Sequence, residues 1–201
     1  LENGFAVCLP DVRATGETSP DSRHGPSSQE TSLAATELMF GETFLGARLK
    51  DLRTVLAWVG TREDLDPRRI ALWGDSFAPP NPPRIVVDEA LNWQIGPEVQ
   101  HQAEPLGGLL AILGALYQTE VRAVAVRGGL ASYMSILQDR FVYVPKDIIV
   151  PGVVEAGDIG DVVAALAPRA VLLEDMVDGR NRLVSRKAQA TDVAAWLRAH
   201  L

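Results

Sequence analysis

Cysteine and histidine are scarce in this sequence of 201 residues, which contains one Cys and three His. The single cysteine, Cys8, excludes an intrachain disulfide, and its place in an apolar run favours an inert core position. The chain has no C-x-x-C or H-x-x-x-H pattern, so we expect no metal site. It also lacks the G-x-G-x-x-G and G-x-x-x-x-G-K-[ST] motifs of nucleotide sites, and we therefore predict that it holds no cofactor.

Basic clusters and long apolar runs are absent as well. With a formal net charge of −7 and no grouped Lys and Arg, the sequence excludes a nucleic-acid partner. The longest apolar runs, at 107–117 and 148–154, are shorter than the roughly 20 residues that span a bilayer, and the first residues do not resemble a signal peptide. We expect a soluble chain without a membrane partner.

Hydrophobic residues make up 47% of the chain and charged residues 22%, which is typical of a soluble globular protein. A chain of this length buries roughly 70% of the surface that it exposes when unfolded, so we expect one domain over residues 1–201. The first residue is Leu1, and the sequence opens directly on a strand-like segment. We therefore expect a processed chain or a fragment whose earlier strands lie elsewhere.

Short apolar runs alternate with helical patterns along the chain. Strands are predicted at 4–12, 69–74, 121–127 and 170–173, and helices at 45–59, 105–117, 131–138, 158–166 and 190–201. This alternation favours right-handed crossovers and a three-layer α/β/α sandwich with a mostly parallel sheet. The first predicted helix has a leucine stripe, and we expect its charged residues on the solvent face: Arg48, Lys50, Asp51 and Arg53.

Two stretches interrupt the alternation. Residues 15–31 are rich in Ser, Pro, Gly and charged residues, which predicts a loop. Residues 77–104 contain five prolines, too many for a regular helix interior or a central strand, and we predict an irregular insertion there. Within this insertion, Trp93 is either a lid anchor or a platform on which a sugar ring stacks.

The segment Gly74-Asp75-Ser76-Phe77 follows a predicted strand and has the start of a nucleophile elbow. In such an elbow, G-x-S-x-G places a serine on a sharp strand-to-helix turn. Ala78 stands where the pattern has glycine, and two prolines follow. Two interpretations stay open: Ser76 is the nucleophile of a hydrolase, or it is an ordinary serine in front of a proline-rich loop.

Four segments in this order resemble the α/β-hydrolases of the acetyl xylan esterase and dienelactone hydrolase-like branch: DVRATGETSP, GARLKDLRTVLAWV, DPRRIALWGDSFA and APRAVLLEDMVDGRNR. The resemblance covers most of the chain and implies an α/β-hydrolase fold that lacks its first three strands. It implies a serine esterase acting on acetyl esters of carbohydrates, in a secreted or periplasmic location. The sequence itself does not decide the compartment. It also does not decide whether the chain pairs with a second copy or with the missing N-terminal segment.

The resemblance also assigns roles to the residues of the motif. Ser76 is the nucleophile, and the backbone N–H of Phe77 stabilises the oxyanion. Asp75, between the strand and the serine, is counted with the binding residues, as is Trp93. The ligand implied by these roles is a small-molecule or carbohydrate ester.

A serine hydroxyl is a weak nucleophile at neutral pH, so it needs a histidine base and an acid that orients this base. In the family the acid follows the strand predicted here at 170–173, and Asp178 is our prediction. Other acidic residues of the same loop compete with it: Glu174 and Asp175. His101 is the predicted base, and the two other histidines are expected on the surface: His24 and His200.

The helix that usually follows the elbow is deferred in this chain, because the next apolar helical pattern begins at Pro105. Either the insertion at 77–104 follows a retained elbow, or it displaces Ser76 and leaves Pro105 at the position of the nucleophile. The first alternative predicts an esterase. The second predicts a catalytically inactive hydrolase-fold module with a binding or structural role, or a divergent site built from His101 and Glu104. An unrelated doubly wound binding domain is the third interpretation.

Overall fold

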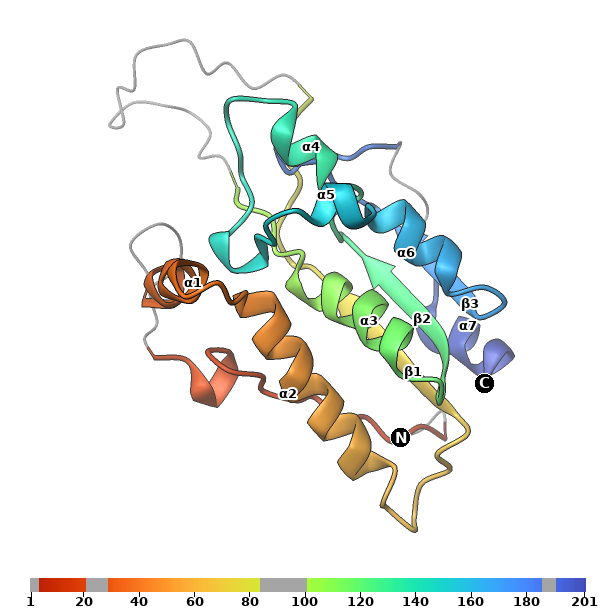
Figure 1. Cartoon of the computed structure of the whole chain (residues 1–201). Helices are drawn as coiled ribbons and strands as arrows, with labels where there is room; N and C mark the ends of the chain where they lie inside the picture. The colour runs from red at the N-terminus through yellow and green to blue at the C-terminus, as the bar shows by residue number, and fades with distance from the viewer. Residues whose placement is uncertain (1–3, 21–28, 84–100, 186–190) are drawn as a thin grey trace.

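A three-stranded parallel sheet forms the centre of the fold (Figure 1). The computed structural model describes residues 4–20, 29–83, 101–185 and 191–201. The strands lie in the spatial order β1-β2-β3, with these bounds: β1 (Ile70–Asp75), β2 (Val121–Arg127) and β3 (Ala170–Glu174). All three were predicted from the sequence, and a mixed α/β fold with an open parallel sheet is confirmed.

Helices cover both faces of the sheet (Figure 1). The helix α3 (Leu106–Tyr117) packs against β1 and β2, and α7 (Val193–His200) packs against β2 from behind. All residues of β2 are buried except Arg122 and Arg127. This burial on two sides explains the apolar run in β2, because a central parallel strand contacts a helix layer on each face.

Glycines let α3 approach the sheet at backbone distance. A Cβ at Gly74 would lie 2.2 Å from the backbone of Gly107, and one at Gly108 would lie 2.7 Å from the side chain of Val126. A side chain at Gly74 would push the helix away from the sheet, and one at Gly108 would displace the side chain of Val126. The helix is buried on most sides, which agrees with its almost continuous apolar sequence.

The predicted helix at 45–59 is confirmed as α2 (Phe44–Val59), which packs on α3 through its leucine stripe. It begins after Thr43, whose side chain accepts a hydrogen bond from the Gly46 N–H at 3.1 Å. The helix α6 (Ile159–Ala165) begins in the same way after Asp158, whose carboxylate accepts the first helical N–H. Each cap satisfies a donor that the helix itself leaves unpaired.

The other helical segments are these: η1 (Gly16–Thr18), α1 (Gln29–Met39), α4 (Met134–Leu137), η2 (Lys146–Ile148) and α5 (Val153–Ala156). The helix α4 lies within the one predicted at 131–138, α6 within 158–166 and α7 within 190–201. The sequence pattern did not predict α1, α5 or η2. The beginning of α1 lies in the stretch predicted as a loop.

The strand predicted at 4–12 is wrong. In the structure this segment belongs to no strand, and Val7 and Leu9 are 71% and 88% exposed. A strand needs partners for its N–H and C=O groups, and among the described residues no strand pairs with this segment. The core position expected for Cys8 is wrong for the same reason, since Cys8 is exposed.

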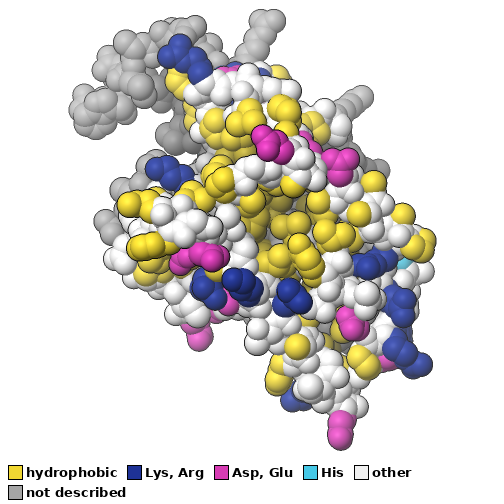
Figure 2. Space-filling view, in the orientation of Figure 1, with side chains coloured by type: hydrophobic (Ala, Val, Ile, Leu, Met, Phe, Trp, Pro, Cys, Tyr) yellow, Lys and Arg dark blue, Asp and Glu magenta, His cyan; other side chains and the backbone are white. Residues whose placement is uncertain are grey.

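The insertion at 77–104 is described at its two ends. Residues 77–83 and 101–104 contain neither helix nor strand, as predicted, whereas Trp93 and its neighbours at 84–100 lie outside the described residues. Figure 2 shows apolar side chains gathered in a hollow on the face that carries α2 and α3. Among the described helices, none has both the length and the apolar character needed to cross a bilayer.

Candidate functional site

Three loops meet at the carboxyl edge of the sheet: residues 76–83 after β1, 101–105 before α3 and 175–183 after β3. The strands end together here, because their last residues are in register: Asp75, Arg127 and Glu174. In open α/β sheets, ligands bind outside this edge. The candidate residues within the described part of the chain lie on or beside these loops.

Two buried asparagines fix the three loops to one another. Asn81 Nδ2 donates to the carbonyl oxygens of His101 and Arg180, both at 2.9 Å, and Asn81 Oδ1 accepts the His101 N–H at 2.8 Å. Asn181 Nδ2 donates to Pro79 O at 3.0 Å and to His101 O at 3.1 Å. Since a hydrogen bond of this kind contributes about 1 kcal/mol, the set gives this edge a fixed shape.

Ser76 extends β1 without a sharp turn. Its N–H donates to Arg127 O at 3.0 Å, which lengthens the β1–β2 ladder, and its Oγ accepts the Ala78 N–H at 3.3 Å. Among the described residues, three residues other than glycine have a left-handed backbone, and Ser76 is not one of them: Ala14, Asp175 and Asn181. A nucleophile elbow is a strained turn from strand to helix, whereas the next helix in this chain begins at Leu106.

The backbone N–H of Phe77, which the family resemblance assigns to the oxyanion hole, donates to Glu104 Oε2 at 3.3 Å. Glu104 directly precedes Pro105, the N-cap residue of α3. A carboxylate at the start of a helix is favourable, because the helix dipole is positive there. The donor expected for an oxyanion is thus engaged by a carboxylate of the chain itself.

The contacts of the described residues include no hydrogen bond that joins Ser76, His101 and Asp178. The His101 backbone is held by the asparagine bonds, and its side chain is exposed. The Asp178 carboxylate accepts from Arg182 Nε at 2.8 Å and from the backbone N–H groups of Arg180 and Arg182 at 2.9 and 3.0 Å. Asp178 therefore stabilises the loop that follows β3.

Asp75 and Glu174, which flank Arg127 at the strand ends, form ion pairs with it. Arg127 Nη2 lies 3.0 Å from Glu174 Oε2, and Arg127 Nη1 lies 3.7 Å from Asp75 Oδ2. Burial by itself raises the pKa of Glu174, but hydrogen bonds from Thr191 and Arg127 outweigh this effect and lower the pKa below its ordinary value. These side chains tie the three strand ends together and join them to the segment before α7.

A cavity of about 470 Å³ opens beside two of these loops, the one after β1 and the one before α3, and residues of α1 and η2 complete its wall. Its volume is within the range of about 300–1,000 Å³ that is usual for ligand pockets. Three carboxylates line it: Glu30, Glu104 and Asp147. Apolar side chains form much of the remaining wall: Phe77, Ala78, Pro79, Ala103, Leu106 and Pro145. His101 is the basic side chain among the described lining residues.

A buried charge cluster borders this cavity. Arg48 of α2 is fully buried, and its guanidinium donates to Asp147 Oδ2 and to Glu30 Oε1. Arg48 Nε also donates to Arg13 O at 3.0 Å, and the guanidinium lies 4.4 Å from the centre of the Phe44 ring. The solvent position predicted for Arg48 is therefore wrong, because two carboxylates and a carbonyl oxygen replace the water that this side chain loses.

Asp147 presents a hydrogen-bond acceptor without a donor. It is 4% exposed, and its Oδ1 has no hydrogen-bond partner among the described residues. Burial raises the pKa of Asp147 to about 6; the ion pair with Arg48 opposes this rise, and the neighbouring Glu30 carboxyl reinforces it. An unpaired buried acceptor costs about 1–3 kcal/mol, so this oxygen, which solvent does not reach, destabilises the fold.

No motif in the sequence identifies Glu30, Arg48 and Asp147, which come from α1, α2 and η2. The leucine stripe carries one usable signal, because Arg48 lies three residues after Leu45 and directly before Leu49. That spacing places Arg48 on the packed side of the helix. No comparable signal marks Asp147, whose partner on α2 is 99 residues away.

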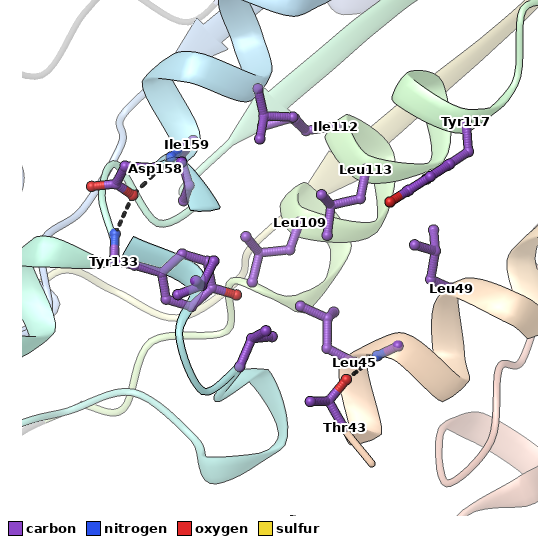
Figure 3. Close-up of a pocket in the computed structure, with 15 residues that line it drawn as sticks. Thr43, Leu45, Leu49, Leu109, Ile112, Leu113, Tyr117, Tyr133, Asp158 and Ile159 are labelled. Atoms are coloured by element: carbon purple, nitrogen blue, oxygen red, sulfur yellow. Dashed lines mark hydrogen bonds between the residues drawn. The ribbon is translucent and has the colours of Figure 1, made fainter. Parts of the chain in front are cut away.

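A second hollow, of about 210 Å³, lies between α2, α3 and α6 (Figure 3). Apolar side chains project into it from all three helices: Leu45, Leu49, Leu109, Leu113 and Ile159. Polar groups at its rim are bonded, since Tyr133 Oη donates to Ile148 O at 2.9 Å and the Asp158 carboxylate accepts the N–H groups of Tyr133 and Ile159 at 2.7 Å. This apolar groove therefore offers a ligand few polar contacts.

Comparisons with known proteins give no family for this chain. No protein-family model matches it, and neither does any curated protein or solved structure. Among the described residues, no group of three or more His, Cys, Asp and Glu side chains is placed to hold a metal ion. A functional proposal therefore depends on the geometry of the carboxyl-edge cavity.

Proposed function

We propose that this chain is a ligand-binding α/β module that holds a small molecule in the cavity of about 470 Å³ at the carboxyl edge of its sheet. The hydrogen bond from the Phe77 N–H to Glu104 Oε2 carries this proposal. An ester hydrolase needs such a donor for the negative charge that develops on the substrate oxygen. A carboxylate in this place repels that charge, so the arrangement favours binding over ester hydrolysis.

The fixed shape of the cavity supports the same proposal. Asn81 and Asn181 join the loops by hydrogen bonds to main-chain groups, and both side chains are buried. A site that keeps its shape without the ligand loses less conformational entropy on binding, and it binds more tightly for this reason.

We also infer a relationship to the α/β-hydrolases, on the order and contacts of the elements. The helix α3 follows β1 across the insertion and packs against it through Gly74 and Gly107, and the acidic loop follows β3. In this relationship the insertion separates Ser76 from the start of the helix. Glu104 and Pro105 then occupy the place that a nucleophile has in the family.

Ester hydrolysis through Ser76, the function implied by the family resemblance, is the second candidate. The observation in its favour is the contact between Ser76 and Gly128, where a Cβ would lie 2.7 Å from Ser76 Cβ. Gly128 has a left-handed φ of 68°, and it leaves room for the serine side chain at the end of β1. This candidate requires Ser76 to react with an ester although Glu104 engages the neighbouring N–H.

A serine-directed fluorophosphonate probe distinguishes the two candidates. The binding proposal predicts that the probe does not label Ser76 and that the chain does not hydrolyse 4-nitrophenyl acetate above the rate of a Ser76→Ala variant. Labelling and hydrolysis that are lost in Ser76→Ala, and kept in a Ser185→Ala control at an exposed serine, would establish the esterase instead.

Nuclear magnetic resonance tests binding directly. Backbone amide signals of Phe77, Gln102 and Glu104 report on the cavity, and three probes of similar size differ in charge: benzylamine, benzyl alcohol and benzoate. We expect at least one probe to shift these signals with a dissociation constant on the order of 1 mM, as for a fragment of about eight heavy atoms. If none of the three shifts them, the binding proposal is overturned.

A further inference from the structure

We propose that the free edge of β1, beside α2, accepts one added β-strand from an extended segment of another polypeptide. The site lies apart from the cavity and does not depend on the proposed function. Three features of this side of the molecule lead to it: backbone groups of β1 without a partner, a helix layer that extends past the sheet, and apolar side chains that stay exposed.

One side of β1 is paired and the other side is free. The Ser76 N–H donates to Arg127 O of β2 at 3.0 Å. Because the backbone groups of a strand point alternately to its two sides, those of Gly74 also face β2, whereas those of Ala71 and Trp73 face away from it. Among the described residues no strand pairs with β1 on that side. Such a row of unpaired N–H and C=O groups is a template for another strand.

The helix layer is wider than the sheet on this side. The helix α3 covers β1 and β2, and α2 packs on the side of α3 that faces away from β2 (Figure 1). At Gly114 of α3, a Cβ would lie 2.9 Å from Leu52 of α2 and 3.0 Å from Leu72 of β1. Helices pack about 8–10 Å apart and strands about 4.8 Å apart. The helix α2 therefore covers a position next to β1 that holds no strand of the described chain.

Apolar side chains around this position are incompletely covered. Trp73 of β1 is 51% exposed. In α2, the half that follows Leu52 has no buried residue, although apolar residues recur there at helical spacing: Val55, Leu56 and Val59. Successive side chains of a strand point to opposite faces. An added strand would therefore cover the apolar residues of α2 with one face and Trp73 with the other.

The apolar segment at 4–12 does not occupy the free edge. Arg13 attaches the end of this segment to α2, because its N–H and its Nε donate to Asp51 Oδ2 at 3.0 and 2.8 Å. Residues 6–11 are all exposed, and residues 4–11 make no backbone–backbone hydrogen bond with the described chain. The edge of β1 thus remains open to a strand from elsewhere.

The charges at the two ends of β1 favour an antiparallel partner. Arg68 and Arg69 precede the strand, and the pairing of Arg68 with Asp66 leaves one positive charge in excess. At the other end, the carboxylates of Asp75 and Glu174 share one arginine, which leaves one negative charge in excess. Opposite charges on facing strand positions stabilise a sheet. A partner with a basic first residue and an acidic last residue therefore fits when it runs antiparallel to β1.

Hydrogen exchange of the full chain, followed by nuclear magnetic resonance, tests whether the edge is free. We expect the amide hydrogens of Ala71 and Trp73 to exchange at least tenfold faster than that of Gly74, which faces β2. Equal protection of the three would show that the edge is already occupied, and it would overturn the inference. If the chain alone is dimeric in analytical ultracentrifugation and protection of Trp73 rises with its concentration, the occupant is a second copy and not another polypeptide.

The peptide acetyl-KVTVTVE-amide is the probe for an added strand. When it runs antiparallel to β1 with its valines beneath α2, the N–H groups of its threonines point toward β1. At about 1 mM it should slow the exchange of Ala71 and Trp73 at least threefold. N-methylation of both threonines should weaken its binding at least tenfold, whereas N-methylation of two valines, the matched control, should change it less than threefold. The reversed peptide EVTVTVK should bind at least threefold more weakly.

Contrary results separate the parts of the inference. If neither KVTVTVE nor EVTVTVK slows exchange at Ala71 and Trp73, the strand site is overturned. Equal affinities of the two N-methylated peptides would overturn backbone pairing, and equal affinities of KVTVTVE and EVTVTVK would overturn the antiparallel direction. None of these results affects the proposed function, whose test uses other probes and the amide signals of other residues.

Discussion

The apolar groove and the carboxyl-edge cavity differ in how completely their polar groups are paired. At the groove rim, Tyr133 and Asp158 are hydrogen-bonded to neighbouring backbone groups. At the cavity, Asp147 Oδ1 has no donor among the described residues, and Glu104 meets a backbone N–H. Both hollows border the same helix, α3, so the difference comes from the other walls. At the groove the polar groups are paired with backbone groups, whereas beside the cavity, where η2 packs against α1 and α2, one buried carboxylate oxygen stays unpaired among the described residues.

The buried cation beside the cavity gives the largest expected effect. Arg48→Met should lower the free energy of unfolding by about 3–5 kcal/mol, because Asp147 would then be a buried carboxylate without a counter-charge and the partly exposed Glu30 would lose its ion pair. Urea denaturation measures the change. Lys50→Met, at an exposed position of the same helix, should change stability by less than about 0.5 kcal/mol. Equal effects of the two substitutions would show that Arg48 does not stabilise the cluster.

Truncation of the groove wall should destabilise the fold without affecting the cavity. Leu109 is 3% exposed, and Leu109→Ala should lower the free energy of unfolding by about 2–4 kcal/mol. The affinity of a probe that shifts the cavity signals should stay the same, because Leu109 lines the groove and is not a lining residue of the cavity. A change in affinity of more than fivefold would mean that the two hollows are coupled. Leu137→Ala, at a residue 70% exposed, is the matched control.

Asp147 should also make stability depend on pH. The pKa of Asp147 rises from 3.8 to about 6 in the folded chain, where it faces Glu30 of α1 and Arg48 of α2. The folded state therefore holds this proton more tightly than the unfolded chain, and the resulting stability is present below about pH 4 and lost as pH rises through about 6. Relative to Asp147→Asn, the natural chain should lose on the order of 2 kcal/mol between about pH 4 and 7 in urea denaturation.

Asp51 provides the opposite case for the same measurement. Its pKa is lowered, chiefly because Arg13 donates hydrogen bonds to its carboxylate. Its contribution to stability is present above the ordinary pKa of an aspartate and is lost as pH falls. Relative to Asp51→Asn, the natural chain should therefore lose stability toward acid. If the stability difference between the natural chain and each variant changes with pH in the same direction for Asp51→Asn and Asp147→Asn, the opposite pKa shifts of the two carboxyls are contradicted.

The smallest expected effect concerns the exposed ring of the cavity. Phe77→Ala should change the free energy of unfolding by less than about 0.5 kcal/mol, because the side chain is 90% exposed. It should weaken about threefold the binding of a probe that shifts the cavity signals, as expected for the loss of contact with one exposed lining ring. Phe40→Ala, at a ring 80% exposed, should leave both quantities unchanged. An unchanged affinity in Phe77→Ala would remove the ring from the binding surface.

The sheet and its main helices could be predicted because their patterns are local. The apolar runs of β1, β2 and β3, and the leucine spacing of α2, contain the information that places them. The segment at 4–12 has the same kind of apolar run and is not a strand, because a strand also depends on a neighbour that its own residues do not specify. An apolar run in the sequence therefore does not by itself show that the segment pairs with a strand of the sheet.

The sequence predicted which loops form the candidate site, but it did not predict the charged cluster beside it. The sequence pattern pointed to Ser76, Phe77 and the pair His101 and Glu104, and in the structure the loops of these residues meet at one edge. The serine mechanism stays a prediction. The leucine spacing could have placed Arg48 on the packed side of α2, but its partners could not be predicted, because Asp147 is 99 residues away in sequence.

The hydrogen bonds between Asn81 and His101 have a consequence for how the chain tolerates changes in length. These bonds join two points that are 20 residues apart in sequence, so the chain leaves the carboxyl edge and returns to it at nearly the same place. The entropy of closing a loop between two fixed ends grows only slowly with the number of residues in it. The domain can therefore accept a shorter or longer connection here while the sheet, the asparagine bonds and the cavity keep their arrangement. This makes the position a practical one for grafting a new segment.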